Sequence, residues 1–424
     1  EPFSVKYKEG VQLPLPSCPP RRLAPAVLAD MKDEVADLLA RGIIRESISA
    51  QAAPIHPVRK SDQTWRLCVD YKILNDKIEP VRYPLPCAQD LISTLAGHAY
   101  FARLDMHSGY WQIGVVPESQ DDLAFVTPFG LYTWNRMPMG VTTGPPVFAH
   151  RVNGILGAVH NCAVFLDDIC VYGKTKADFL ATLRQVFVIL RDHDIRLKRT
   201  KCRLNLQCVQ YLGFIVNGQG YSQSQSRKQA LRDVTVPTST KQIRSFVGLA
   251  NTFRDFLPDF SVKARPLTAL CGKGTQFHWG PAQQRAFETI KAAALEAPLL
   301  SFVDPDKHQL VLQTDASTAG VGGVLLACDP EGRELPVAYV SKAFTDVEAR
   351  WSVSEQESFA AFYCMRKREQ VGRGTHGVRR TEHRKGFLLQ RGGLVHAKHV
   401  PPSKSCGIPP CLVGSFGLLS CIRP

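Results

Sequence analysis

Long apolar stretches are missing from this chain of 424 residues. No run approaches the roughly 20 apolar residues that a membrane-spanning helix needs, so we expect no membrane span. The first residues also lack the basic stretch followed by an apolar stretch that marks a secretory signal peptide. Because the sequence starts at Glu1 and not at a methionine, we expect a fragment of a longer chain.

Paired cysteines are missing as well. The 13 cysteines are odd in number and scattered singly, which is typical of free thiols in a reducing compartment. Charged residues make up only 21% of the chain and hydrophobic residues 44%, a balance that favours a folded globular protein over a disordered one. The formal net charge of +14 favours an anionic partner such as nucleic acid. Most of this excess follows Arg366, so it is weak evidence of function.

Hydrophobic periodicity divides the chain into five segments. Residues 1–26 are rich in proline and predict an extended lead-in. Over residues 27–225 a helix is followed by short β-type runs that alternate with helical stretches, which predicts an α+β fold with antiparallel strands. Apolar residues in 226–298 recur at helical spacing, and 299–365 predict strands followed by a helix. Residues 366–424 show no period, so we expect an irregular basic tail.

Asp167 and Asp168 stand side by side between two apolar β-type runs, Ala163–Leu166 and Ile169–Tyr172. Adjacent carboxylates repel each other, and burying them without a counter-charge would be costly. One interpretation is a two-residue hairpin turn with solvated aspartates, although Asp-Asp suits such a turn poorly. The other is a Mg²⁺ site, since Mg²⁺ takes hard oxygen ligands and leaves positions open for phosphate oxygens.

A third carboxylate, Asp105, ends the apolar run Tyr100–Leu104 and precedes a glycine-containing turn, His107–Tyr110. Such a turn can present backbone N–H groups to a triphosphate. On its own Asp105 would be an ordinary strand-end aspartate. Together with the Asp pair it would complete a site for two metal ions about 3.5–4 Å apart, as phosphoryl transfer uses.

These motifs resemble a known family. Phe165-Leu166-Asp167-Asp168 is similar to the aromatic-x-Asp-Asp signature of reverse transcriptases, and Arg103–Ile113 resembles the first catalytic motif of the gypsy-type group. Five further segments match in order and spacing: the fingers segment Trp65–Asn75, the nucleotide-pocket segments Ala124–Gly130 and Met137–Thr142, the primer grip Tyr211–Phe214, and the helix Arg244–Asn251. The chain is identified as a member of the reverse transcriptase and ribonuclease H region of gypsy-type long-terminal-repeat retrotransposon polyproteins, truncated or frameshifted at its C-terminus.

The resemblance implies a right-hand polymerase, with fingers and palm over 27–225 and thumb and connection helices over 226–298. A partial ribonuclease H-like α/β domain would follow over 299–365. The implied activity is RNA-directed and DNA-directed DNA synthesis, in which two Mg²⁺ ions, with Mn²⁺ as a substitute, bind Asp105, Asp167 and Asp168.

The resemblance also implies roles for residues around the aspartates. Tyr110 would be the steric gate that excludes a ribose 2′-hydroxyl, with a plain core tyrosine as the alternative. Lys201 would lie near the leaving group, with an exposed surface lysine as the alternative. The remaining residues are Lys60 and Arg66 at the triphosphate, Met139 and Gly140 lining the nucleotide pocket, and Tyr211, Leu212, Gly213 and Phe214 in the primer grip.

Asp315 and Glu357 look like the first two metal carboxylates of the ribonuclease H domain, where the metal would be Mg²⁺. Spacing alone offers another role for Glu357, a capping box with Ser354 at the start of a helix. The third carboxylate would be Glu382, but glutamate is longer than the expected aspartate and its flanks lack a strand pattern. We therefore expect a defective ribonuclease H.

The implied partners are an RNA template, a DNA primer–template, an RNA–DNA hybrid and dNTPs, with no membrane. An oligomer with itself or with other polyprotein products is left open. The implied location is a cytoplasmic virus-like particle, with later nuclear entry of the product. Two alternatives remain: a non-catalytic nucleic-acid-binding remnant or host-adopted derivative, and an RNA-interacting scaffold that acts through the basic tail. The zinc-like spacing of His396, His399, Cys406 and Cys411 is interpreted as coincidence.

Overall fold

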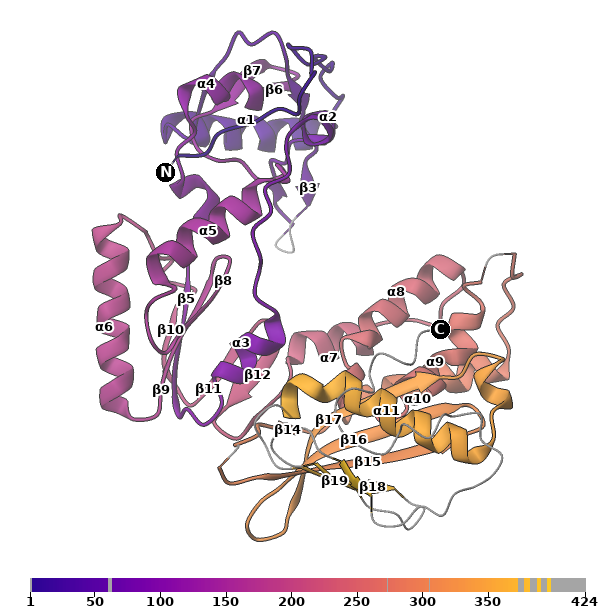
Figure 1. The fold of residues 1–424 in the computed structure, drawn as a ribbon. Coiled ribbons are helices and arrows are strands. Elements are labelled where there is room, and N and C mark those ends of the chain that lie inside the picture. The colour runs from indigo at the N-terminus through magenta and orange to yellow at the C-terminus, as the bar shows by residue number, and fades with distance from the viewer. Residues whose placement is uncertain are drawn as a thin grey trace. The chain divides into compact units, whose positions relative to one another are not determined.

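The computed structural model describes residues 2–59, 63–272, 274–304 and 306–372, and beyond them the backbone of three short strands at 377–381, 387–389 and 395–397. The chain forms two compact units, and each is described here by itself (Figure 1). Unit 1 comprises residues 1–94 and 99–207, and unit 2 comprises residues 95–98 and 208–424. Within the described residues, no helix has both the length and the apolar character needed to cross a membrane.

Unit 1 is built of helices around two four-stranded sheets. Its helices are α1 (Pro25–Ala40), α2 (Lys72–Lys77), α3 (Ala88–Thr94), α4 (Pro117–Gln120), α5 (Gly144–Leu156) and α6 (Lys176–Asp192). One sheet has the order β1-β7-β6-β2, formed by β1 (Ile44–Glu46), β2 (Ala53–Pro54), β6 (Phe125–Thr127) and β7 (Gly130–Trp134). The other has the order β10-β5-β9-β8, formed by β5 (Tyr100–Asp105), β8 (Cys162–Phe165), β9 (Asp168–Gly173) and β10 (Arg203–Leu206). A separate hairpin pairs β3 (Val58–Arg59) with β4 (Trp65–Arg66).

The sheet with β5 and β9 at its centre is well buried within unit 1. Ile169, Cys170 and Val171 of β9 are fully buried, and α6 packs against β9 and β5 (Figure 1). Helix α6 begins after Thr175, whose hydroxyl oxygen accepts a hydrogen bond from the Asp178 N–H and so satisfies one of the free donors of the first turn. Its buried residues recur at helical spacing, which seals this face of the sheet.

The N-terminal segment before α1 is packed onto unit 1. Phe3 and Leu15 are buried, and Phe3 and Tyr7 form isolated bridges with Val115 and Ile78. The segment has little regular structure, as its prolines predict, but its apolar side chains contribute to the core.

Unit 2 contains a small sheet, a helical layer and a larger sheet. The small sheet has the order β11-β12-β13-β14, formed by β11 (Cys208–Tyr211), β12 (Phe214–Asn217), β13 (Gly220–Gln223) and β14 (Leu300–Ser301). The helices are α7 (Gln225–Arg232), α8 (Thr240–Asn251), α9 (Phe260–Ala269), α10 (Pro281–Leu295) and α11 (Val353–Gly372). The larger sheet has the order β17-β16-β15-β18-β19-β20, formed by β15 (Gln309–Ser317), β16 (Gly320–Cys328), β17 (Glu334–Ala343), β18 (Gly377–Thr381), β19 (Phe387–Leu389) and β20 (Val395–Ala397).

The C-terminal part of unit 2 differs from the sequence prediction. The helix expected at the end of 299–365 runs from Val353 to Gly372. Three strands follow where no structure was assigned, and β18 pairs in parallel with β15, with Thr381 opposite Thr314. The flank Gly377–Thr381 was therefore wrongly described as lacking a strand. Its pairing partner lies more than 60 positions earlier, so local periodicity could not reveal it.

Candidate active site

The two adjacent aspartates have different positions in the hairpin that β8 and β9 form. Phe165 pairs with Asp168, which leaves Leu166 and Asp167 as the two turn residues. Leu166 has a φ of 54°, the left-handed conformation that hairpin turns of this kind require. An Asp-Asp turn with both side chains in solvent is therefore wrong, since Asp168 is the first residue of β9 and its side chain is only 24% exposed.

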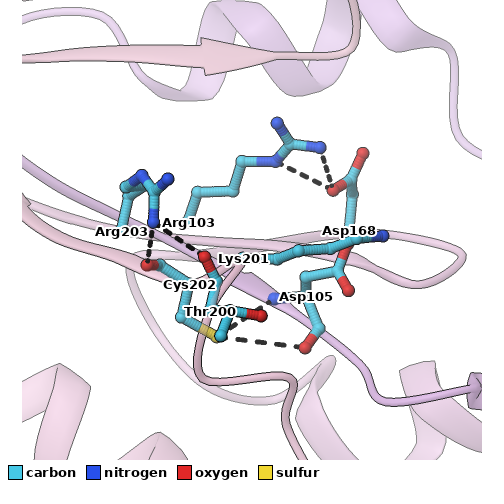
Figure 2. A network of polar contacts seen from close by, with 7 residues as sticks. All are labelled: Arg103, Asp105, Asp168, Thr200, Lys201, Cys202 and Arg203. Atoms are coloured by element: carbon cyan, nitrogen blue, oxygen red, sulfur yellow. Dashed lines mark hydrogen bonds and ion pairs between the residues drawn. The ribbon is translucent and has the colours of Figure 1, made fainter. Parts of the chain in front are cut away.

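Asp105 lies directly opposite Asp168 in the antiparallel pairing of β5 with β9. Its side chain is 15% exposed, and its carboxylate Oδ2 lies 3.5 Å from the ammonium nitrogen of Lys201. The thiol of Cys202 lies against the Asp105 backbone, with its sulfur 3.5 Å from the backbone nitrogen (Figure 2). The segment that ends at Asp105 and the segment that contains Asp167 and Asp168 thus meet at the same place in the sheet.

Arg103 is a functional candidate that the sequence motifs did not single out. Its guanidinium donates two hydrogen bonds to Oδ1 of Asp168, from Nε at 3.0 Å and from Nη2 at 2.8 Å (Figure 2). Arg103 precedes Asp105 by two residues, so the two side chains lie on the same face of β5. That two-residue spacing from Asp105, in a strand-like run, was the available signal.

Electrostatic repulsion accompanies this gathering of carboxylates. Partial removal from water raises the pKa of Asp167, and the negative charges of Asp168 and Asp105 raise it further, while Lys201 opposes them. The pKa of Tyr110 is raised by burial and by the charge of Asp167. The Asp167 carboxylate therefore lies close enough to Asp168, Asp105 and Tyr110 for their charges to interact.

The donor set fits a divalent cation. Three carboxylates supply the hard oxygen ligands that Mg²⁺ and Mn²⁺ take, and bound metal would remove the repulsion that raises the Asp167 pKa. Across the described residues, no three acidic, histidine or cysteine side chains are already grouped as a metal site. Asp105 and Asp168 instead have Lys201 and Arg103 as counter-charges.

The expected nucleotide pocket lies in the same unit. The ring of Tyr110 packs on Phe148 at a centroid distance of 5.1 Å and remains partly exposed. Met139 is exposed, and Gly140 has a φ of 98°. A Cβ at Gly140 would lie 3.2 Å from the carbonyl oxygen of Val69. Asn75 holds this loop by donating to the Gly140 carbonyl at 2.9 Å and accepting from the Thr142 N–H at 2.9 Å.

Of the residues expected to bind the triphosphate, only some lie among the described residues. Arg66 is exposed on β4 of the β3–β4 hairpin. Lys60 lies outside the described residues. Lys201 is exposed, as the alternative interpretation held, but its contact with Asp105 places it at the carboxylate cluster.

The expected primer grip belongs to unit 2 and forms the β11–β12 turn. Tyr211 pairs with Phe214, and the intervening Leu212 and Gly213 both have positive φ, at 50° and 83°. This is the backbone geometry of a tight two-residue hairpin, in which glycine at the second position relieves steric strain.

A second pair of carboxylates lies where α11 meets the larger sheet of unit 2. Asp315 is on β15, and Glu357 on α11 accepts a hydrogen bond from the neighbouring Ala316 N–H at 3.3 Å. Oε2 of Glu357 is buried without a hydrogen-bond partner. The cap of α11 is formed by Ser352 and Glu355, which bond each other's backbone N–H groups, so the capping role considered for Ser354 and Glu357 is wrong. Glu382, His399, Cys406, Cys411 and the side chain of His396 lie outside the described residues.

Two family models match the chain. The model described as "Reverse transcriptase (RNA-dependent DNA polymerase)" matches residues 58–216, which contain Asp105, Asp167 and Asp168. The model described as "RNase H-like domain found in reverse transcriptase" matches residues 279–377, which contain Asp315 and Glu357.

Similar proteins come from transposons and from a retrovirus group. The transposon Tf2-3 and Tf2-4 polyproteins of Schizosaccharomyces pombe are each 32% identical over 361 residues, which cover 84% of this chain. The chain spans 27% of the length of these relatives. A foamy viral protease–reverse transcriptase solved with double-stranded DNA has a TM-score of 0.77 at 25% identity and covers 88% of this chain and 67% of its own. The foamy viral enzyme solved with an RNA/DNA hybrid has a TM-score of 0.73 at 24% identity, over 88% of this chain and 51% of its own, and shows the fold alone.

Proposed function

The chain belongs to the reverse transcriptases of gypsy-type long-terminal-repeat retrotransposon polyproteins, with an RNase H-like domain following the polymerase fold, and on this premise we propose that it extends a DNA primer on RNA and DNA templates. One observation carries the proposal: Asp105 and Asp168 are register partners across two paired strands, with Asp167 in the adjoining turn. Three carboxylates in this arrangement serve the transfer of a nucleotidyl group.

In this proposal Asp105, Asp167 and Asp168 hold two divalent cations, Mg²⁺ or Mn²⁺. The metals would supply activation of the primer 3′-hydroxyl and neutralisation of the leaving pyrophosphate. Arg103 orients the Asp168 carboxylate through one oxygen, which stabilises the position of this ligand. Lys201, exposed beside Asp105, donates to negative charge that develops on the phosphates.

Nucleotide selection would come from the pocket beside the aspartates. The Tyr110 ring, supported from below by Phe148, excludes a ribose 2′-hydroxyl by its bulk. Met139 and Gly140 line the pocket, in a loop whose shape Asn75 maintains. Arg66 and Lys60 bind the triphosphate as charged donors.

The nucleic acid would be held by the backbone and shape of the duplex. The solved foamy viral relatives contain double-stranded DNA or an RNA/DNA hybrid, and we propose the same classes of partner for this chain. The outer face of α8 carries the exposed residues Lys241, Arg244, Ser245 and Gly248 at helical spacing, and no atom lies within 4 Å of a Cβ built at Gly248. Such a face, basic and locally flat, suits close approach to a phosphate backbone.

For the RNase H-like domain we propose that Asp315 and Glu357 bind a divalent cation, which would give the buried Glu357 Oε2 a partner. Glu382 as the third ligand would displace the metal because its side chain is one methylene longer than that of aspartate. We therefore propose that cleavage of the RNA strand is weak or absent.

Primer extension tests the polymerase proposal. A 5′-labelled DNA primer is annealed to an RNA template and, in parallel, to a DNA template of the same sequence, and extension is followed with dNTPs and Mg²⁺ or Mn²⁺. Binding of each duplex is measured by fluorescence anisotropy in the same buffer. Template-directed extension on both supports the proposal.

The same experiment separates the alternatives. Duplex binding without extension in either metal would contradict the enzyme and favour a non-catalytic binding remnant. Binding that survives deletion of residues 1–360 would favour a scaffold that acts through the basic tail.

A further inference from the structure

Arg227 of α7 lies beneath the turn of the β11–β12 hairpin. Its Nη2 donates a hydrogen bond to the carbonyl oxygen of Leu212 at 3.2 Å, and its guanidinium lies over the Phe214 ring at 5.1 Å from the centroid. The space under Gly213 is filled by the same group, because a Cβ built there would lie 2.2 Å from the Arg227 Cζ. One side chain therefore contacts three successive residues of the turn.

The Arg227 guanidinium is also connected, through Gln223, to the end of α8. Arg227 Nη1 donates to Oε1 of Gln223 at 3.1 Å, and Gln223, which is only 1% exposed, donates from Nε2 to the carbonyl oxygen of Thr252. Thr252 is the C-terminal capping residue that directly follows α8. A continuous chain of hydrogen bonds thus runs from the turn to the C-terminal end of α8.

This contact is costly to build. Burial lowers the pKa of the Arg227 guanidinium, because removing a cation from water disfavours its charged form. Arg232 of the same helix is exposed, and its Nη1 donates to Oε1 of Gln229 at 3.1 Å within its own helix. A half-buried arginine that donates to both the turn and Gln223 serves to fix their geometry.

We infer that Arg227 is the positioning residue of the primer-grip turn, and that with Gln223 it sets the turn in fixed relation to the end of α8. This inference rests on the proposed function, in which α8 contacts the duplex, and on the primer-grip role that the family resemblance implies for the turn. Arg227 touches neither the nucleotide nor the reacting atoms and acts through Leu212 and Gly213. Without it, the primer terminus would be bound but poorly aligned.

The first test needs no activity. Hydrogen–deuterium exchange of the free protein is measured for the amides of residues 212–214 in wild type, Arg227→Gln and the control Arg232→Gln. We expect exchange at these amides to rise about tenfold or more in Arg227→Gln only, because local opening becomes easier. Equal exchange in all three proteins would overturn the inference, whatever the polymerase assays show.

The second test measures primer alignment. Single-turnover incorporation is compared with duplex affinity and with the melting temperature. For Arg227→Gln we expect the maximal rate to fall about tenfold or more, as misplacement of a reacting group does, while the dNTP concentration at half-maximal rate and the duplex Kd stay within about twofold. Arg227→Lys should recover part of the rate, since lysine reaches one acceptor but cannot bridge two.

Gly213→Ala provides an internal check, because the new methyl group would displace the guanidinium. Its rate defect should resemble that of Arg227→Gln, and the double variant should be no slower than the worse single variant. The inference would be overturned if the rate fell only as much as the fraction of folded protein does. It would also be overturned if the rate defects of the two single variants were fully additive in the double variant. A wild type without any incorporation would defeat the proposed function alone and leave the exchange test standing.

Discussion

Asp105 and Asp168 are register partners across β5 and β9, and each has its own cation, Lys201 for Asp105 and Arg103 for Asp168. The strand pairing brings together two carboxylates that are 63 positions apart in sequence. The cations offset their repulsion while no metal is bound. The fold therefore brings two carboxylates together and places a cation beside each of them, which stabilises this arrangement of like charges.

The ion pair between Arg103 and Asp168 predicts that the stability of an Arg103 variant depends on added metal. Arg103→Gln leaves Asp168 beside two other carboxylates without its counter-charge, so we expect the free energy of unfolding to fall by about 1.5–3 kcal/mol, the range for a hydrogen bond to a charged group. Mn²⁺ should restore part of that loss. Differential scanning fluorimetry with and without Mn²⁺ measures both, and a variant that responds to Mn²⁺ no more than wild type does would contradict the idea.

Tyr110 predicts sugar selectivity. Replacement by alanine removes the ring that Phe148 supports, so the preference for dNTP over rNTP should fall by about tenfold or more, since 1.4 kcal/mol of lost steric exclusion corresponds to tenfold. Tyr110→Phe keeps the ring and should keep the preference. Incorporation of dCTP and CTP opposite the same template guanine measures the ratio. Unchanged selectivity in Tyr110→Ala would make Tyr110 a plain core residue.

The start of α11 predicts a difference between two nearby serines. Ser352→Ala removes the side chain that accepts from the Glu355 N–H, so the free energy of unfolding should fall by about 1 kcal/mol. Ser354→Ala, at an exposed position outside the cap, should change it by less than about 0.5 kcal/mol. Urea denaturation monitored by circular dichroism compares them. Equal losses would mean that the cap lies elsewhere.

Asp122 predicts a pH dependence of stability. Burial raises its pKa, despite hydrogen bonds from Tyr7 and Gln51 that lower it. The folded state therefore binds the Asp122 proton more tightly than the unfolded state, and stability is lost as pH rises from the unfolded pKa, about 3.9, through the raised folded value.

Asp122→Asn removes this penalty and keeps an oxygen that accepts from Tyr7 and Gln51. The variant should melt about 1–3 °C above wild type at pH 7, and the difference should shrink towards pH 4. Asp76→Asn, at an exposed carboxylate elsewhere in unit 1, is the control. A difference that is constant with pH would show that the Asp122 charge is not the cause.

Local sequence patterns predicted much of unit 1. The apolar runs before Asp105 and around the Asp pair became β5, β8 and β9, because a strand's character is set by its own alternating or buried residues. The family resemblance to a reverse transcriptase followed by an RNase H-like domain is confirmed by both family models. The roles of the individual site residues and the domain boundaries stay predictions.

What the sequence could not supply depends on pairing between distant segments. Ser352 and Ser354 each precede a glutamate by three positions. Which of the two pairs forms the cap depends on the residue at which α11 begins, and the local sequence is compatible with either start. The contact of Arg103 with Asp168 requires the register of β5 on β9. Residues 377–381 form the strand β18 by pairing with the edge of β15, and the local sequence of β18 does not predict this pairing.

The central claim is that Asp105, Asp167 and Asp168 form the metal-dependent centre of a DNA polymerase. Labelled dTTP incorporation on poly(rA)·oligo(dT) with Mg²⁺ tests it most directly, with Asp167→Asn/Asp168→Asn compared with the matched control Asp192→Asn/Asp194→Asn at the exposed end of α6. The account predicts incorporation by wild type and by the control, and a loss of about a thousandfold or more in the first variant, or about 4 kcal/mol of transition-state stabilisation. Incorporation that persists in a folded Asp167→Asn/Asp168→Asn protein would contradict it.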